Sequence, residues 1–431
     1  MKCFLLCLLP AALCSAQSML VPAPAPSKPL LIENVIVHTA MKDPARLTGW
    51  VLIEDGRISA MGDSAVGDLP EHTQILDAQG LHLVPGFIAL ASQLGLVEVL
   101  QVDATDDRRE TTDRTPELAP WVSINPSSAL LPVARSAGIL HTLVVPSGGT
   151  IPGRASVIRL DGWTTEDLAV LRDAGLVVRW PLATPIRASW MRRSSDDQKN
   201  RSIKQKKELT AFFDDARAWH AAREANPHTP GDLRFEAMGS VLRGERPVFF
   251  LANSRGQIED SLTFAEAQGL LPIILGGADA ARCLDAIKAS GAAVIIDGVH
   301  RLPLARHSAW DDPFALAARL EAAGIPFAIA GGDEPAHLRA LAHHAATAVA
   351  HGLSPDRALR AITSSAAELA GVGDRLGMIT PGHSATFFLC DGEPLEMASP
   401  PLRAWIDGRE IDLGDRQKLL FRKYRERYVQ E

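Results

Sequence analysis

The middle of the chain alternates short apolar runs with stretches whose apolar residues recur at helical spacing. Such runs, rich in β-branched residues, are typical of strands buried on both faces. They lie at residues 84–96, 139–145, 157–160, 177–179, 247–251, 272–275, 293–296 and 327–330. Eight strands alternating with helices predict an α/β fold, a TIM-like (β/α)8 barrel over residues 85–376. Functional residues of such a barrel stand on loops at the carboxyl ends of its strands.

Two long segments interrupt this alternation. Residues 101–128 form a polar loop directly after the first strand, and loops of this length are usually functional or mobile. Residues 192–224 are charged and helical in pattern, with Phe212, Phe213, Ala216 and Trp219 on one face. We interpret that face as core rather than as a ligand site.

Both ends of the chain carry shorter elements. Residues 30–37, 49–58 and 75–80 have the pattern of strands joined by Asp-Gly and Gly turns, and a matching set returns at 376–390 and 402–411. Residues 414–431 mix basic with apolar residues and predict a helical tail. We expect that tail to dock on the barrel, with a membrane-surface role as the weaker alternative.

The first residues have the zones of a secretory signal peptide. Met1-Lys2 is followed by an apolar run and then by Cys14-Ser15-Ala16, which predicts cleavage after Ala16 and export to the periplasm or beyond. A lipoprotein anchor is disfavoured because bulky Leu13 precedes Cys14. The run is too short for a membrane span, which needs about 20 apolar residues. Residues 17–28, with alternating prolines, predict an extended and solvated linker.

Composition narrows the classes of protein further. A hydrophobic fraction of 46% and a charged fraction of 22% exclude wholesale disorder, and a net charge of −7 without a basic stripe argues against nucleic acid as partner. After signal-peptide cleavage only Cys283 and Cys390 remain. Both lie in apolar surroundings, so we expect two buried thiols and no disulfide framework.

Several segments resemble the amidohydrolase superfamily. Residues 85–88 read Pro-Gly-Phe-Ile at the start of the first strand, and residues 353–363 are similar to a Gly-Leu-Ser-x-x-x-Ala-Leu-x-x-x-Thr helix of the imidazolonepropionase-like and prolidase-like branch. The resemblance covers about residues 30–413. It implies that residues 29–84 and 377–413 fold together as a small β-sandwich domain beside the barrel.

The resemblance also implies a metal site that this chain has largely lost. The family holds its metal with His-x-His after the first strand, one His each after the fifth and sixth, and an Asp after the eighth. The matching positions are Ala91, Gln93 and Leu251, and the sixth strand has no nearby His. Alanine and leucine have no donor atom, and glutamine is a rare ligand. Only Asp333 still offers a match, and its favoured interpretation is a cap of the helix that begins at residue 334.

We therefore name Asp333 as the catalytic candidate and expect no standard metal ligand and no cofactor. The residues expected to line the pocket are Gln93, Asn253, Arg255, Asp279 and His300. A weak or non-standard divalent site, for zinc, would combine Asp333 with Asp103, Asp279, Asp297 or His300. The glycine-rich loop at 147–153 lacks the Lys of a P-loop, so we expect it to shape the pocket.

Two functions fit these residues. The first is an exported amidohydrolase-family protein that is impaired or inactive as a metal hydrolase, a pseudoenzyme that acts as a binding or partner subunit. Its partners would be a small-molecule or dipeptide-like ligand, a second copy of the chain or an active paralogue, with no nucleic acid and no membrane span. The alternative is a hydrolase of C–N bonds that uses Asp333 and a non-standard metal site.

Overall fold

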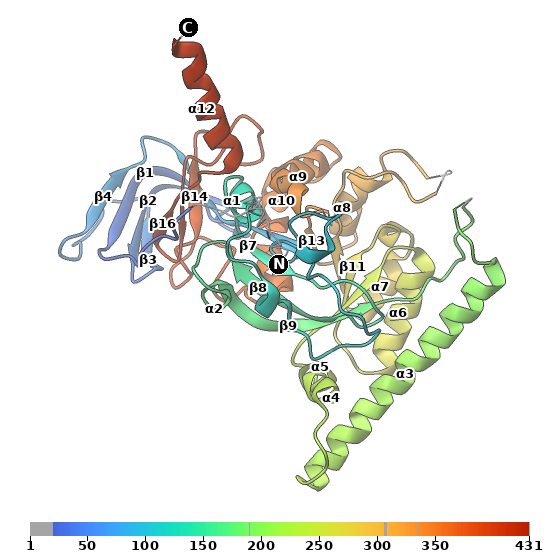
Figure 1. Cartoon of the computed structure of the whole chain (residues 1–431). Coiled ribbons are helices and arrows are strands. Elements are labelled where there is room, and N and C mark those ends of the chain that lie inside the picture. Colours follow the sequence, from blue (N-terminus) through green and yellow to red (C-terminus); the bar gives the residue numbers. More distant parts are fainter. Residues whose placement is uncertain (1–19, 189, 306–307, 333, 431) are drawn as a thin grey trace, which may run out of the picture.

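The computed structural model describes residues 20–430 except 189, 306–307 and 333 (Figure 1). Its larger sheet has eight strands in the order β13-β12-β11-β10-β9-β8-β7-β6. They are β6 Phe87–Ser92, β7 Ile139–Val144, β8 Gly153–Arg159, β9 Ala169–Arg179, β10 Val248–Ala252, β11 Pro272–Gly276, β12 Ala293–Ile296 and β13 Phe327–Ile329. Buried apolar side chains such as Leu90, Phe249 and Ile295 pack together as one core. The predicted TIM-like barrel is confirmed.

One strand departs from the predicted repeat of strand and helix. β8 pairs antiparallel with both β7 and β9, while the other neighbouring strands are parallel. Only residues 145–152 separate β7 from β8, and a crossover between parallel strands needs a dozen or more residues. The expectation of eight strand–helix units was therefore wrong for β7, β8 and β9, which form a meander.

Helices cover the outside of the barrel (Figure 1). Those that flank or connect the barrel strands are α1 Leu130–Arg135, α2 Thr165–Leu168, α3 Ser195–Ala225, α4 Leu233–Ala237, α5 Gly239–Leu242, α6 Arg255–Ala267, α7 Leu284–Ser290, α8 Asp312–Ala322, α9 Leu341–Ala350, α10 Pro355–Ala361 and α11 Ser364–Leu369. Short 3-10 helices lie at η1 Asp103–Thr105, η2 Pro120–Ser123, η3 Ala280–Arg282 and η4 Pro335–Ala340. Local sequence sets their starts: Ser254 and Gln257 form a capping box on α6, and Ser354 caps α10 with Pro355 at its first position.

A second sheet joins the two ends of the chain. Its order is β16-β15-β14-β5-β1-β2-β3, and β4 also pairs with β1. The strands are β1 Leu30–His38, β2 Arg46–Glu54, β3 Arg57–Gly62, β4 Gln74–Asp77, β5 His82–Pro85, β14 Phe387–Cys390, β15 Arg403–Ile406 and β16 Arg409–Ile411. An irregularity near Asn34, whose φ is 53°, divides β1, so that its first half pairs with β4 and its second half with β5. The strands form one continuous hydrogen-bonded sheet with a core of its own.

The sheet and the barrel share part of their packing. Phe388 of β14 meets Phe87 of β6 edge to face, with ring centroids 5.0 Å apart. Gly86 N donates to the carbonyl of Thr386 at 3.1 Å. Gly138 has φ of +84°, and a Cβ there would lie 2.8 Å from the Phe388 ring, so this approach requires glycine. The two parts are therefore in direct contact through aromatic and backbone groups.

The segment before β1 has no helix or strand over residues 20–27. It is nevertheless held at Ala23, whose N–H donates to Asp161 at 3.1 Å and whose carbonyl accepts from Arg409 at 3.2 Å. Asp161 is buried and also accepts from Arg135 at 2.6 Å. The expected fully solvated linker is thus wrong at Ala23, because a buried ion cluster binds its backbone there. The signal-peptide prediction for residues 1–16 lies outside the described residues.

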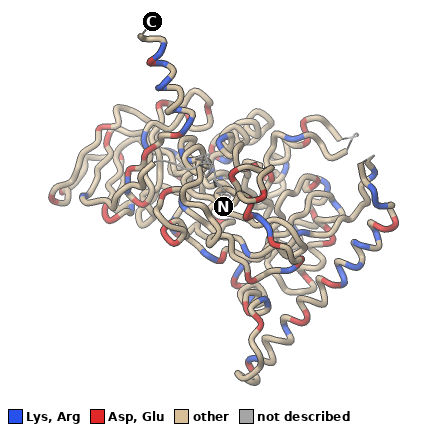
Figure 2. Tube along the Cα trace, in the orientation of Figure 1, with Lys and Arg blue, Asp and Glu red and all other residues tan. Residues whose placement is uncertain are grey.

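Two helices project from the main body. Long α3 buries Phe213 and Ala216, as its predicted inner face requires, and carries charges of both signs along its length (Figure 2). α12, Arg416–Gln430, has no buried residue and points away from the barrel (Figure 1). The expectation that this tail docks on the barrel was wrong. Among the helices of residues 20–430 that the structure describes, none combines the length and apolar character that crossing a bilayer requires.

Candidate functional site at the barrel mouth

A cavity of about 630 Å³ opens where the carboxyl ends of β6, β7 and β9 meet the N-terminal half of α3. Its volume lies within the range of about 300–1,000 Å³ that is usual for small-molecule sites. It is lined by Gln93, Leu100, Arg108, Arg109, Asp113, Ser147, Gly148, Gly149, Arg179, Arg201, Gln205 and Glu334. The lining is mostly polar, and the predicted pocket-shaping role of the glycine-rich loop is confirmed by Ser147, Gly148 and Gly149.

An arginine occupies the neighbourhood of the family's first ligand pair. Arg108 Nη1 donates to Gln93 Oε1 at 2.9 Å. The same guanidinium holds Asp106 with two hydrogen bonds, Nε to Oδ1 at 2.7 Å and Nη2 to Oδ2 at 2.6 Å. Hydrogen bonding from Arg108 lowers the pKa of the Asp106 carboxyl below its usual value. The side chain that stands at a metal-ligand position is therefore engaged by a protein cation.

The loop after β6 is fastened to the loop between β7 and β8. Ser147 N donates to the Arg108 carbonyl at 2.7 Å, and Thr150 N donates to the Asp113 carbonyl at 2.8 Å. Thr150 Oγ1 donates to Asp113 Oδ2 at 2.8 Å. Gly149 has φ of +60°, and a Cβ at this position would overlap the Asp113 carbonyl. These contacts fix the backbone that carries Arg108 and Arg109.

The remaining family ligand positions offer no metal donors. Ala91 is buried, has φ of 56° and lacks a donor atom. Leu251 at the end of β10 packs on the apolar barrel core. Across the residues that the structure describes, no group of three or more His, Cys, Asp or Glu side chains could hold a metal ion. The described residues at the mouth thus do not fit the metal that the resemblance implies.

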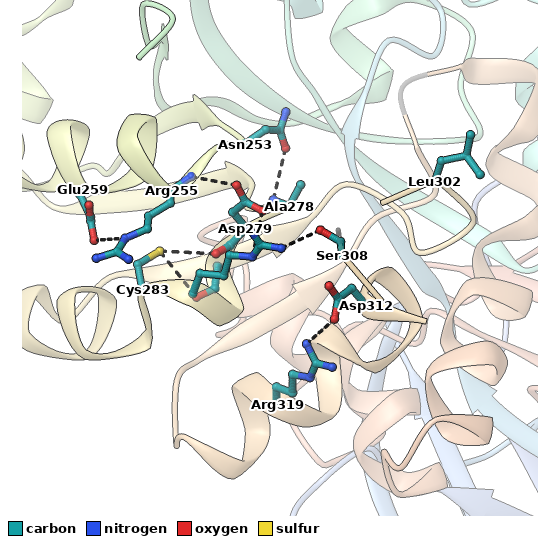
Figure 3. Close-up of polar contacts among 12 residues, drawn as sticks. Asn253, Arg255, Glu259, Ala278, Asp279, Cys283, Leu302, Ser308, Asp312 and Arg319 are labelled. Carbon is teal, nitrogen blue, oxygen red and sulfur yellow. Dashed lines mark hydrogen bonds and ion pairs between the residues drawn. The ribbon is translucent and has the colours of Figure 1, made fainter. Parts of the chain in front are cut away.

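Three of the predicted pocket residues lie together at the ends of β10 and β11 (Figure 3). Asp279 Oδ2 accepts from the backbone N of Arg255 at 3.2 Å, and Asn253 Oδ1 accepts from Ala278 N at 3.4 Å. The Arg255 guanidinium turns to Glu259 at 2.7 Å. Cys283, beside Asp279, is buried, and burial raises the pKa of its thiol to about 12. These groups tie the strand ends to the helices that follow, and Gln93 alone of the five is among the residues lining the 630 Å³ cavity.

His300, the fifth predicted pocket residue, belongs to a histidine pair. Its ring stacks on His344 of α9 with centroids 4.1 Å apart, and its Nε2 lies 2.8 Å from Thr347 Oγ1. His344 Nδ1 accepts from Val299 N at 3.0 Å. Burial lowers the pKa of His344 to about 4. The pair anchors the loop after β12 to α9.

The catalytic candidate Asp333 lies outside the described residues, and its role stays a prediction. Of the carboxylates named for a non-standard metal site, Asp103 lies exposed on η1 and Asp297 directly follows β12. Glu334, which follows Asp333, lines the cavity and pairs with His337 at 3.6 Å.

Four arginines of the cavity were missed by sequence reasoning. Arg108 and Arg109 lie in the polar loop 101–128, which was expected to be functional, and Arg179 is the last residue of β9. The sequence could have indicated Arg179, because it lies at the carboxyl end of a barrel strand, where functional residues stand. Arg201 lies on α3, and no local pattern placed that helix at the mouth.

Comparisons with known proteins agree with this fold. The Amidohydrolase family model matches residues 252–414, a range that begins at the end of β10 and so omits β6 and its ligand positions. A relative named Amidohydrolase tasK, from Hapsidospora irregularis, is 23% identical over 88% of this chain. The chain spans 43% of the length of that relative.

Solved structures with the same architecture include several enzymes. An amidohydrolase from Thermotoga maritima has a TM-score of 0.76, with 23% identity over 89% of this chain and 99% of that one. A zinc-bound adenosine deaminase from Xanthomonas campestris has a TM-score of 0.54, with 19% identity over 95% and 100% of the two chains. A putative prolidase from Bifidobacterium longum has a TM-score of 0.53, with 16% identity over 93% and 100%. Residues 252–414 thus match the Amidohydrolase family model, and the solved structures share the fold of the chain.

Proposed function

We propose that this chain is an exported amidohydrolase-superfamily protein that does not act as a metal hydrolase and instead binds a small ligand at the barrel mouth, as a binding or partner subunit. The observation that carries the proposal is the contact between Gln93 and Arg108. A metal hydrolase needs a cation held by neutral imidazoles and carboxylates to lower the pKa of bound water. Here a guanidinium, already neutralised by Asp106, bonds to the side chain at the ligand position.

The proposal explains two features of the site together. Arg108 Nη1 already donates to Gln93 Oε1, the atom that would have to bind a cation, so a metal ion at this position would have to displace the guanidinium. The cavity itself is still built, because hydrogen bonds fasten its walls and polar groups line it. A built pocket whose described residues offer no group of metal ligands supports ligand binding over metal-dependent hydrolysis.

The test is elemental analysis of the full chain, purified without chelator and again after incubation with zinc, manganese or iron. We expect much less than one retained metal per chain under each condition, and no hydrolysis of a panel of dipeptides and cyclic amides. A matched variant replaces Ala91, Gln93 and Leu251 by His and Arg108 by Gln. That variant should gain zinc relative to the parent.

The contrary result is well defined. Stoichiometric metal in the parent, or amide hydrolysis that Asp333→Ala abolishes, would establish the alternative of a C–N hydrolase with a non-standard site. Contaminating hydrolase is controlled by purifying Asp333→Ala in parallel.

Export rests on the pattern of residues 1–16 and has its own test. We expect a mature N-terminus at Gln17, measured by intact mass after expression with the native leader in a bacterial host. A chain recovered with Met1 in the cytoplasmic fraction would contradict this part of the proposal.

A further inference from the structure

The cavity at the barrel mouth carries more positive than negative charge. Its lining includes four arginines and two carboxylates, Asp113 and Glu334. Arg108 is paired with Asp106, which leaves Arg109, Arg179 and Arg201. Within residues 20–430 as the structure describes them, none of these three guanidinium groups forms a hydrogen bond or an ion pair with another residue. Three cations thus line one cavity, and none of them has an ion-pair partner within 4.0 Å among the residues that the structure describes.

Some exposed arginines elsewhere in the described part of the chain are paired, while others, such as Arg193, Arg339 and Arg422, have no hydrogen bond or ion pair of their guanidinium. Arg46 binds Glu393 through two hydrogen bonds of 2.7 and 2.8 Å, and Arg403 binds Glu410 through two of 2.7 Å. Arg243 likewise holds Glu245. An arginine without an ion pair is therefore not unusual in this chain, and the observation that matters is that three of them line the same cavity.

The three cations come from separate walls whose backbones are fixed. Arg109 follows Arg108, whose carbonyl accepts from Ser147 N, and a Cβ at Gly148 would lie 2.9 Å from Arg109 Cβ. Arg179 N donates to Thr150 O at 2.9 Å. Arg201 precedes Ser202, whose Oγ donates to Leu182 O at 2.7 Å. Because these backbones are fixed, a ligand has to order only the side chains and not the segments that carry them.

We propose that this cavity binds a small organic dianion, a molecule that presents two carboxylates or a phosphate monoester to Arg109, Arg179 and Arg201. The proposal rests on the ligand-binding function proposed above and names the chemistry of the ligand. Guanidinium forks match the planar oxygens of carboxylate and phosphate groups. Arg108 is paired with Asp106 and Asp113 lies 3.8 Å from Arg114, so Arg109, Arg179 and Arg201 face the single charge of Glu334 and leave two positive charges to be balanced. A volume of 630 Å³ is space for a molecule larger than a single inorganic ion.

The test is calorimetric titration of the full chain at low ionic strength with three probes. They are succinate, glycerol 3-phosphate and the uncharged succinamide. We expect at least one dianion to bind and succinamide not to bind. Because the contact is ionic and open to solvent, raising salt from about 50 to about 500 mM should weaken binding at least several-fold.

Variants locate the binding. Arg109→Gln, Arg179→Gln and Arg201→Gln should each weaken the dianion about tenfold, the usual worth of one charge-assisted hydrogen bond. All three side chains are exposed, so the variants should fold, which far-UV circular dichroism checks. The matched control removes three arginines from α12, as Arg416→Gln, Arg422→Gln and Arg425→Gln, and should keep the parent affinity.

The outcomes separate the two proposals. Binding of succinate alone identifies a dicarboxylate site, and binding of glycerol 3-phosphate alone identifies a phosphate site. No binding of either dianion, equal binding of succinamide, or equal loss in the α12 control overturns the dianion proposal even if the chain holds no metal. A chain that holds stoichiometric metal and still binds the dianion through these arginines overturns the proposed function and leaves this inference standing.

Discussion

Asp161 is a carboxylate buried between arginines from two parts of the chain. Its side chain is 1% exposed and lies 2.6 Å from Arg135 and 3.3 Å from Arg409. Burial lowers the pKa of Arg135. The negative charge of Asp161 offsets the free-energy cost of holding the charged guanidinium in the interior.

We predict that Asp161→Ala destabilises the protein by about 3–5 kcal/mol, because it leaves a buried guanidinium without its counterion. Urea unfolding followed by tryptophan fluorescence measures the change. Glu245→Ala, which breaks an exposed pair with Arg243, is the control and should leave the midpoint unchanged. A small effect at Asp161 would mean that water reaches Arg135.

Buried histidines make stability depend on pH. Burial is the main cause that lowers the pKa values of His38, His141 and His344, each to about 4 from an ordinary value of 6.5. The unfolded chain therefore binds more protons than the folded one between about pH 4 and 6.5. Stability is complete above that window and falls as the pH drops through it.

For His344 alone we expect a loss approaching about 1.4 kcal/mol per pH unit within the window. His344→Gln keeps a side-chain acceptor for Val299 N and should reduce the slope of unfolding free energy against pH by about one proton. Denaturation series at several pH values measure the slope, and His72→Gln on an exposed turn is the control. An unchanged slope in His344→Gln would contradict the assignment.

Some individual residues of the site could be identified from the sequence. Ala91, Gln93 and Leu251 could be placed because a motif frames each of them along the chain. The hydrogen bond from Arg108 to Gln93 could not be predicted, since the two residues are 15 positions apart in a long connecting segment and only tertiary structure brings them together. Arg201 depends on how α3 packs, which no local pattern records.

The loop between β7 and β8 is the element that shapes the cavity wall. Gly149 and Gly269 share a φ of +60°, but a Cβ at Gly149 meets the Asp113 backbone while one at Gly269 meets nothing within 4 Å. Alanine variants at these two glycines therefore separate the free-energy cost of a left-handed alanine from the additional cost of a steric overlap.

We predict that Gly269→Ala costs about 1–2 kcal/mol, the price of a left-handed L-residue. Gly149→Ala should cost more, because the loop must also move away from Asp113, and it should weaken the dianion that the cavity binds. Chemical denaturation and calorimetric titration measure the two effects. Equal destabilisation without a change in affinity would show that the wall is not fastened as described.

The sequence did not show in which direction each strand runs within the sheet. An apolar run predicts a strand equally well in either direction, so β8 was found while its antiparallel pairing was not. The decisive information was connection length, because residues 145–152 and 160–168 leave no room for long crossovers. Amphipathic α12 was likewise predicted as a helix, but its detachment from the barrel depends on the shape of the whole surface.

At the scale of the whole molecule, the sheet and barrel share a contact through Phe388 and Phe87. We predict that Phe388→Ala lowers stability by about 3–5 kcal/mol and that both parts still unfold in one transition. Fluorescence of Trp405 in the sheet and of Trp180 in the barrel, each kept as the single tryptophan, reports the two parts. Phe421→Ala, 65% exposed on α12, is the control. Separate transitions in the variant, where the parent shows one, would contradict the prediction and show that this single contact couples the two parts.

Most of the architecture was accessible from the sequence because strand patterns and motifs recur at both ends of the chain. The anchoring of the proline-rich segment was not, since Ala23 has no side-chain signal and is held through its backbone by Asp161 and Arg409.

The meander of β7, β8 and β9 bears on the order in which the barrel folds. Its ladders pair residues close in sequence, such as His141 with Arg159 and Val157 with Leu171, whereas β9 and β10 pair Val177 with Phe249 across the α3 insertion. Closing a short loop costs less chain entropy, so the local ladders should form first. Pulse-labelled hydrogen exchange should protect Val157 before Phe249. One wall of the binding cavity would then exist while the rest of the barrel is still assembling around it.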